Sequence, residues 1–206
     1  MRRKRLMVSI AVLLAACGPA TRSLPPLAPL PEPPAESPLP GDPLPAAALE
    51  GDATFASLHE RGLMVPVLGA APWQVPDTYD AGRDGGRRHD ALDILAPRGT
   101  PVLAADDGVV LRVGSNALGG KVIWAADSER RFAYYYAHLD HYAADLREGQ
   151  TIRRGDVIGY VGTTGNAPPD TPHLHFQAMR IFDEKHYASG PPFNPLSFFT
   201  LTGAAR

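Results

Sequence analysis

The alternation of apolar and polar positions predicts a β-rich domain that begins near Met64. From there on, short runs rich in Val, Ile, Tyr and Phe alternate with Gly, Pro, Asn and Asp, as in "PVLAADDGVVLRVG", "GGKVIWAAD" and "RRGDVIGYVG". Runs of this kind, bounded by turn residues, are typical of strands. No long stretch with a 3.6-residue period interrupts them. We therefore expect an all-β domain, mainly an antiparallel sheet, with short peripheral helices.

Two short helices are predicted at the borders of this domain. The segment "EGDATFASLHERG" has Asp52 as an N-cap, Phe55 and Leu58 on one face, and Gly62 as a stop. The segment "NPLSFF" near the end of the chain has Asn194 as a cap and a proline in the first turn.

The first 16 residues have the pattern of a secretion signal, with four basic residues followed by the apolar run Leu6–Ala16. This run is too short to cross a hydrocarbon core of about 30 Å. A plain cleaved signal or a core helix would leave Cys17 unexplained, because a lone cysteine cannot form an internal disulfide. The stretch Leu14–Cys17 resembles the bacterial lipobox, which implies a lipid-modified cysteine at the mature N-terminus. Gly18, where some lipoproteins carry aspartate, implies the outer membrane.

Proline dominates the segment after Cys17. Eleven of the 22 prolines lie between Pro19 and Ala46. Such a segment favours extended polyproline II, whose rise of about 3.1 Å per residue gives a reach of about 85 Å. We expect either a semi-rigid tether to the membrane or a disordered linker of no special length.

Charge argues against nucleic acid as a partner. The formal net charge is −2, and the signal segment contributes four basic residues and no acidic ones to it. Without them the net charge is about −6, and no basic run remains. Nucleic-acid-binding domains usually carry a basic patch.

A candidate chemical motif lies in "TPHLHF", residues 171–176. In an extended chain, side chains alternate faces with a period of two, so His173 and His175 share one face while Leu174 and Phe176 share the other. Adjacent histidines on a face that does not build the core have few structural uses. We therefore expect them to serve metal binding or catalysis.

A second polar pair lies in "RRHDALDI", where His89 and Asp93 are four residues apart and share a face on a strand or a helix. Alone, this spacing is equally expected of a surface pair. Catalytic zinc usually has three protein ligands from His, Asp or Glu and an open fourth position. His89 and Asp93 from one strand, with either His173 or His175 from another, would supply those ligands. The remaining histidine would then act on the proton of the attacking water.

A third motif lies in "RFAYYYAHL", where His138 comes near the end of an aromatic strand. Strand alternation places Tyr134 and Tyr136 on the same face as His138. Tyr134 and Tyr135 are expected to pack as part of a half-buried strand. The remaining histidines are expected at the surface or in packing: His59, His141 and His186.

From about Gly86 to Asn194 the chain resembles the lysostaphin-type zinc murein endopeptidases, also called LytM domains. The resemblance lies in "HDALDI", "GTPVLAADDGVV", "YYYAHL", "GDVIGYVGTTG", "PHLHF" and the closing "NP". It implies a lysostaphin-like sheet that forms a groove, with the loop Gly162–Thr171 as one wall. It also implies hydrolysis of peptide cross-links in bacterial peptidoglycan, whose peptide stems or cross-bridges would be the partners.

The resemblance also implies the role of each site residue. The family's metal ligands fall on His89, Asp93 and His175, and the implied metal is zinc. The family's two catalytic histidines fall on His138 and His173. Because all five positions are filled, a zinc metalloendopeptidase is the expected function.

Two other functions remain open. Some members of the family have lost metal ligands and activate other cell-wall hydrolases, but here the ligand set is complete. Biotinyl or lipoyl carriers have similar hairpins around a modified lysine, but Lys121 and Lys185 lack the expected neighbours. We thus expect a precursor with five parts: a signal (1–16), a lipidated cysteine with its tether (17–46), an extension with a short helix (47–85), the peptidase domain (86–200) and a tail (201–206).

Overall fold

The computed structural model describes residues 52–83 and 86–201. The predicted secretion signal, Cys17, the proline-rich tether and most of the predicted tail lie outside the described residues. Within the part of the chain that the structure describes, no helix is both long and apolar enough to span a membrane.

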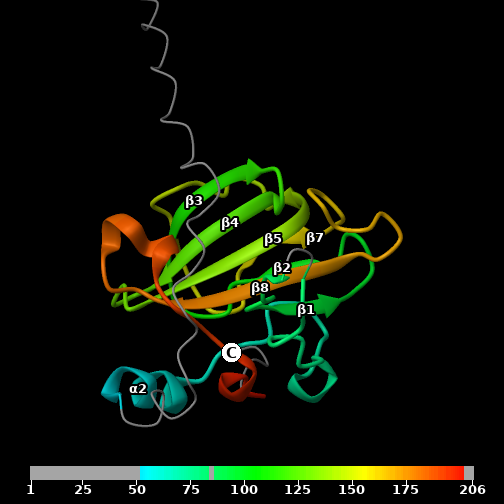
Figure 1. Cartoon of the computed structure of the whole chain (residues 1–206). Helices are drawn as coiled ribbons and strands as arrows, with labels where there is room; N and C mark the ends of the chain where they lie inside the picture. Colours follow the sequence, from blue (N-terminus) through cyan, green and yellow to red (C-terminus); the bar gives the residue numbers. More distant parts are fainter. Residues whose placement is uncertain (1–51, 84–85, 202–206) are drawn as a thin grey trace, which may run out of the picture. The chain divides into compact units, whose positions relative to one another are not determined.

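A single sheet organises the described residues. Its strands are β1 (Leu92–Leu95), β2 (Pro101–Leu103), β3 (Gly108–Asn116), β4 (Gly120–Asp127), β5 (Phe132–Tyr142), β6 (Thr151–Ile152), β7 (Val157–Val161), β8 (His173–Arg180) and β9 (Pro192–Phe193). The main path runs β1-β8-β5-β4-β3-β6, and its strands from β1 to β3 are labelled in Figure 1. Strand β7 pairs with both β2 and β5, and β9 pairs with β8. All these pairings are antiparallel. The predicted antiparallel all-β fold is confirmed.

Helices are short and lie at the borders of the sheet. Among the described residues they are the α-helix α2 (Ala53–Arg61) and three 3₁₀ helices, η1 (Pro72–Gln74), η3 (Glu184–Ser189) and η4 (Leu196–Phe198). The predicted first helix is confirmed, since the Asp52 carboxylate accepts a hydrogen bond from the Thr54 N–H at 2.7 Å and Gly62 ends the helix. The predicted terminal helix is the single turn η4, where the Asn194 side chain accepts from the Leu196 N–H at 3.0 Å.

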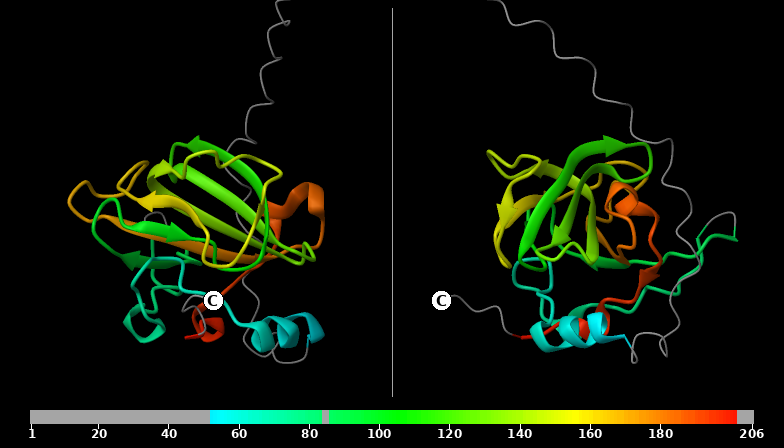
Figure 2. Two further views of the ribbon diagram at one scale, coloured as in Figure 1. Left: turned by 180° about the vertical axis from the view of Figure 1, so that it is seen from behind. Right: turned by 90° about the vertical axis from the view of Figure 1, so that its left-hand side faces the viewer.

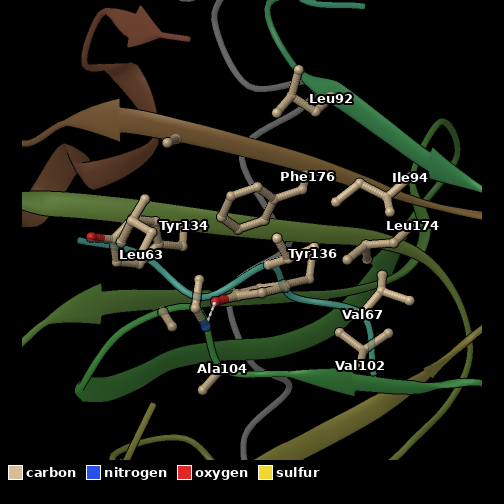
Figure 3. Close-up of a cluster of buried hydrophobic side chains, with 14 of the residues drawn as sticks. Leu63, Val67, Leu92, Ile94, Val102, Ala104, Tyr134, Tyr136, Leu174 and Phe176 are labelled. Carbon is tan, nitrogen blue, oxygen red and sulfur yellow. Dashed lines mark hydrogen bonds between the residues drawn. The ribbon is translucent and has the colours of Figure 1, made fainter. Parts of the chain in front are cut away.

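The larger of the two buried clusters that the described residues form lies on one face of the sheet, where β8 and β5 contribute large aromatic side chains. Leu174 and Phe176 are both fully buried, as the alternation in "TPHLHF" predicts. Tyr134 and Tyr136 point into the same cluster, beside Phe176 (Figure 3). The Tyr136 hydroxyl accepts a hydrogen bond from the Ala105 N–H at 3.0 Å, which satisfies a polar group inside the core.

The segment 52–83 belongs to this same core. Phe55 of α2 packs edge-on against Phe132 and Phe193, with ring centroids 5.2 and 5.0 Å apart. Leu63 forms a parallel bridge with Phe199, so that α2 and the C-terminal segment lie side by side against the sheet (Figures 1 and 2). What we expected as an extension therefore provides a structural layer of the domain.

Candidate metal centre

The first two site residues lie at the start of β1. Asp93 is on the strand, but His89 precedes it, which corrects the expectation that one regular strand carries both. Asp90 between them has a positive φ of 52°, a conformation that turns the chain out of strand geometry. The His89 Nε2 nevertheless lies 3.0 Å from the Asp93 Oδ1. A local turn, and not strand alternation, brings this pair together.

The third residue comes from the neighbouring strand. In the antiparallel pair β1–β8, Asp93 lies directly opposite His175. Side chains that face each other across such a pair have Cβ atoms within about 5.5 Å, close enough for direct contact. The His175 Nδ1 lies 3.0 Å from the Asp93 Oδ1 and 3.1 Å from the His89 Nε2.

These three side chains meet the requirements of a zinc site. His89, Asp93 and His175 each offer one ligand atom, and the three atoms lie within 4.8 Å of one another. Ligand atoms about 2.0–2.1 Å from a tetrahedral zinc would be about 3.3 Å apart. The observed separations of 3.0 and 3.1 Å are close to that value. Two imidazole nitrogens and one carboxylate oxygen also suit this borderline-soft ion.

A β-bulge places the fourth residue, His138. On β4, the step from Lys121 to Ile123 is two residues, whereas their partners on β5, Leu139 and Tyr136, are three residues apart. Strand β5 therefore contains one extra residue, and His138 within it has a φ of +60°. Its backbone N–H donates to the Gly119 carbonyl at 2.7 Å, outside the regular ladder.

The bulge changes the face on which His138 lies. We expected Tyr134 and Tyr136 on the same face as His138, and this is wrong, because both tyrosines are in the core. His138 instead joins the face of Tyr135, whose ring lies 6.1 Å from that of His175. The centroids of the His138 and His175 rings are 5.6 Å apart.

The fifth residue, His173, completes the cluster. Its ring centroid lies 4.9 Å from that of His138, and its Nε2 lies 3.8 Å from the Asp93 Oδ1. His173 and His175 thus share a face, as the alternation predicts, and both are close to Asp93. The structure brings all five residues singled out in the sequence into one site.

The loop between β7 and β8 orients the two histidines that are not in the candidate ligand set. His138 Nδ1 lies 2.8 Å from the Thr164 carbonyl oxygen, and His173 Nδ1 lies 2.8 Å from the Thr171 carbonyl oxygen. Because a carbonyl can only accept, each Nδ1 carries the proton and donates it. In the neutral form of either ring, Nε2 is therefore unprotonated and can accept a proton.

Electrostatics keep the site in a form suited to metal binding. Burial alone would raise the pKa of Asp93, but the His175 and His89 rings beside its carboxylate lower it well below its usual range. Burial lowers the pKa of His175, against the opposing effect of Asp93. Burial also lowers the pKa of His138 to about 4, with the neighbouring His175 adding to the effect. At neutral pH, Asp93 is thus ionised, while His138 and His175 are neutral.

Three contributors to the site were missed by the sequence reasoning: Thr78, Arg83 and Thr164. Thr78 contacts His89 and Asp93, and Arg83 pairs with the Asp93 carboxylate. Thr164 acts on His138 through its backbone carbonyl. Any residue type has such a carbonyl, so the sequence contains no signal for this role.

Comparison with known protein families identifies the family to which a chain with this site belongs. The model of peptidase family M23 matches residues 87–195, more than half of the chain. The chain belongs to peptidase family M23. The resemblance to lysostaphin-type endopeptidases is thereby confirmed, and the five clustered residues all lie within the matched segment.

Named relatives of this M23 chain include an endopeptidase and a lipoprotein. It is 42% identical over 103 residues to the L-Ala–D-Glu endopeptidase of Bacillus subtilis (strain 168), a match that covers 47% of this chain and 31% of the relative. It is 36% identical over 119 residues to the uncharacterised lipoprotein YgeR of Escherichia coli (strain K12), covering 54% of this chain and 44% of the relative. The match thus spans less than half the length of either relative.

A solved structure supports the fold assignment. The M23 chain is similar to the catalytic domain of the antimicrobial peptidase lysostaphin from Staphylococcus simulans, with 28% identity and a TM-score of 0.50. The similarity covers 63% of this chain and 96% of that domain. The matched part of the M23 chain therefore has the fold of that whole domain.

Proposed function

We propose that this chain is a zinc-dependent endopeptidase that hydrolyses peptide cross-links of bacterial peptidoglycan. The observation that carries the proposal is the convergence of His89, Asp93 and His175 on one point, with His138 and His173 beside them. Membership in family M23 and similarity to relatives named as an L-Ala–D-Glu endopeptidase and a peptidoglycan DD-endopeptidase support the substrate class.

In this proposal, His89 Nε2, Asp93 Oδ1 and His175 Nδ1 hold the metal. When bound, zinc supplies Lewis acidity, which polarises a peptide carbonyl and makes a water molecule more acidic. The remaining steps belong to the chain itself. The ligand histidines and carboxylate are held by strand pairing and by the turn before β1, so the donor atoms are preorganised.

His138 and His173 are proposed to move the protons. Each donates its Nδ1–H to a loop carbonyl, which leaves Nε2 as the basic atom. One ring can take the proton of the attacking water at Nε2. A ring protonated in this way becomes an N–H donor, able to stabilise the developing oxyanion or to protonate the leaving amine. No glutamate base is needed in this arrangement.

We further propose that Cys17 carries a lipid anchor that places the domain at the outer membrane, facing the periplasm. The lipobox-like sequence before Cys17 supports this, as does similarity to a relative named as a lipoprotein. A proline-rich tether with a reach of about 85 Å would let the domain act at a distance from its anchor. Labelling of cells with a fatty-acid analogue, followed by membrane fractionation, tests this: Cys17→Ser should lose the label and leave the membrane.

Mass spectrometry of fragments released from purified cell-wall sacculi tests the reaction. The full-length chain in mild detergent, loaded with zinc, is expected to release uncross-linked peptides, whose masses identify the bond that is cut. Chelator treatment and His175→Ala should each abolish the release. His186→Ala is the matched control, because His186 is exposed and contacts only Asp183 through its ring in the described residues.

Two results would contradict the proposal in different ways. Peptide release that survives the chelator would exclude a metal-dependent reaction. A folded, zinc-bound chain that releases no peptides would favour the alternative, a regulator that activates another cell-wall hydrolase.

A further inference from the structure

We infer that Thr78 and Arg83 are positioning residues that set the affinity of the metal centre for zinc. Both precede the family-matched segment. They lie in a short segment, residues 77–83, which we call the strap. The inference rests on the metal site of the proposed function, but it does not depend on the proposed reaction.

Thr78 contacts two candidate ligands at once. Its backbone carbonyl lies 2.8 Å from the His89 Nδ1, so it accepts that proton and leaves Nε2 free to bind metal. Its hydroxyl accepts a hydrogen bond from the Asp93 backbone N–H at 2.9 Å and lies 3.4 Å from the Ala91 carbonyl. One residue thereby fixes both the ring orientation of His89 and the backbone position of Asp93.

Arg83 contacts the part of Asp93 that the metal would not use. The Asp93 Oδ1 faces His89 and His175, each at 3.0 Å, whereas the Oδ2 is paired with the Arg83 guanidinium. The two oxygens thus have separate partners, and the carboxylate plane is fixed between them. This arrangement presents a single oxygen to a metal.

The strap is itself held in place by hydrogen bonds to the segment just before β1 and to the C-terminal segment. The His89 N–H donates to the Ala81 carbonyl at 3.0 Å, and the Asp90 N–H donates to the Tyr79 carbonyl at 2.9 Å. From the other end of the domain, the Asn194 side-chain amide donates to the Asp77 carboxylate at 3.1 and 3.2 Å. The closing "NP" motif thus has a second role beyond capping η4, because it ties the C-terminal segment to the strap.

Contacts of this kind affect metal binding measurably. Groups that hydrogen-bond to metal ligands fix the ring tautomer and the carboxylate orientation, and their loss typically lowers metal affinity about 10- to 100-fold. The strap supplies such a group to two of the three ligands. The M23 segment alone, from residue 87, would lack them.

Zinc affinity of the full-length chain, measured by competition with a chromophoric chelator, tests the inference. Thr78→Val removes the hydroxyl and keeps the shape and the carbonyl, and Arg83→Gln removes the charge. Each is expected to weaken zinc binding about 10-fold or more. Thr78→Ser and Arg83→Lys should recover most of the affinity, and the visible absorption bands of the cobalt-loaded chain should shift in the two damaging variants only.

Matched controls separate positioning from general damage. Thr151→Val changes an exposed threonine on β6, at the other end of the sheet path from β1, and Arg147→Gln removes an exposed charge from the β5–β6 loop. Both should bind zinc as the wild type does. If Thr78→Val fails to fold, Arg83→Gln decides, because the Arg83 side chain is 43% exposed and its loss leaves no cavity in the core.

The outcomes distinguish this inference from the proposed function. Wild-type zinc affinity and cobalt spectra in both Thr78→Val and Arg83→Gln would overturn the inference and leave the proposed function intact. Failure of the wild-type chain itself to bind zinc would overturn both.

Discussion

Asp93 and His175 lie directly opposite each other in the antiparallel pair β1–β8, with the Asp93 Oδ1 3.0 Å from the His175 Nδ1. The same register places Leu92 opposite Phe176 in the core. The pairing that builds the hydrophobic face therefore also sets the distance between two candidate ligands. A slip of one residue would move every side chain of β1 to the opposite face.

Asp93→Asn tests the carboxylate with almost no change of shape. The amide cannot carry the charge that two histidines and an arginine stabilise. Loss of a group that hydrogen-bonds to a metal ligand lowers metal affinity by up to about 100-fold, so we expect loss of the ligand charge itself to lower zinc affinity at least about 100-fold. Isothermal titration with zinc measures this. Asp140→Asn, which changes a carboxylate paired with Arg98 and His141 outside the candidate ligand set, should bind zinc normally. Equal affinities in the two variants would exclude Asp93 as a ligand.

Phe176→Ala tests the core beneath the site. Phe176 is fully buried on the strand that carries His175 on its other face, and its loss should cost about 3–5 kcal/mol of unfolding free energy. Urea denaturation of the metal-free protein measures the change. Phe182→Ala, at a side chain that is 73% exposed, should change stability by less than about 0.5 kcal/mol. A small effect of Phe176→Ala would mean that the core closes around the gap.

Gly120→Ala tests the contact that supports the bulge. Gly120 has a φ of +64°, and an added Cβ would lie 2.2 Å from the Thr164 Oγ1, next to the carbonyl that holds His138. Gly69→Ala is the control, because Gly69 has a φ of +83° and nothing lies within 4 Å of such a Cβ. This control should lose only the free energy of the backbone strain, about 1–2 kcal/mol. Gly120→Ala should lose clearly more unfolding free energy in urea, and peptide release should slow in this variant only. Equal losses would show that the loop gives way freely.

Metal-free protein should lose stability as the pH falls from about 6.5 to about 4. Burial lowers the pKa of His138 from 6.5 to about 4, and the rings of His173 and His175 face it. The unfolded chain therefore binds more protons in this window, so folding weakens with falling pH. The His138 contribution approaches about 3 kcal/mol at the acid end. Urea denaturation at pH 7 and pH 4.5 should show a smaller loss in His138→Gln than in wild type, and identical losses would contradict the assignment.

Sequence patterns predicted the residues whose position follows from regular strand geometry. His173 and His175 share a face, with Leu174 and Phe176 in the core, because a period of two is a property of every strand. The helix from Asp52 to Gly62 was predictable for a similar reason, since its cap and its stop are both local signals.

The rest of the site does not follow from regular strand geometry. His138 reaches the site through a bulge, and the extra residue is apparent only against the pairing with β4. His89 precedes its expected strand because Asp90 adopts a left-handed turn, which is uncommon for a residue other than glycine. Thr78 acts partly through a carbonyl that every residue has, so neither its type nor its spacing marked it. Tertiary pairing decided the positions of His138 and Thr78, and a local turn decided that of His89.

The bulge in β5 also constrains protein engineering. Anyone who grafts this histidine constellation onto a different antiparallel scaffold would need to carry over the additional residue at His138 together with the four side chains around it. In a strand without that extra residue, alternation would turn the imidazole towards the core face and away from the other four side chains.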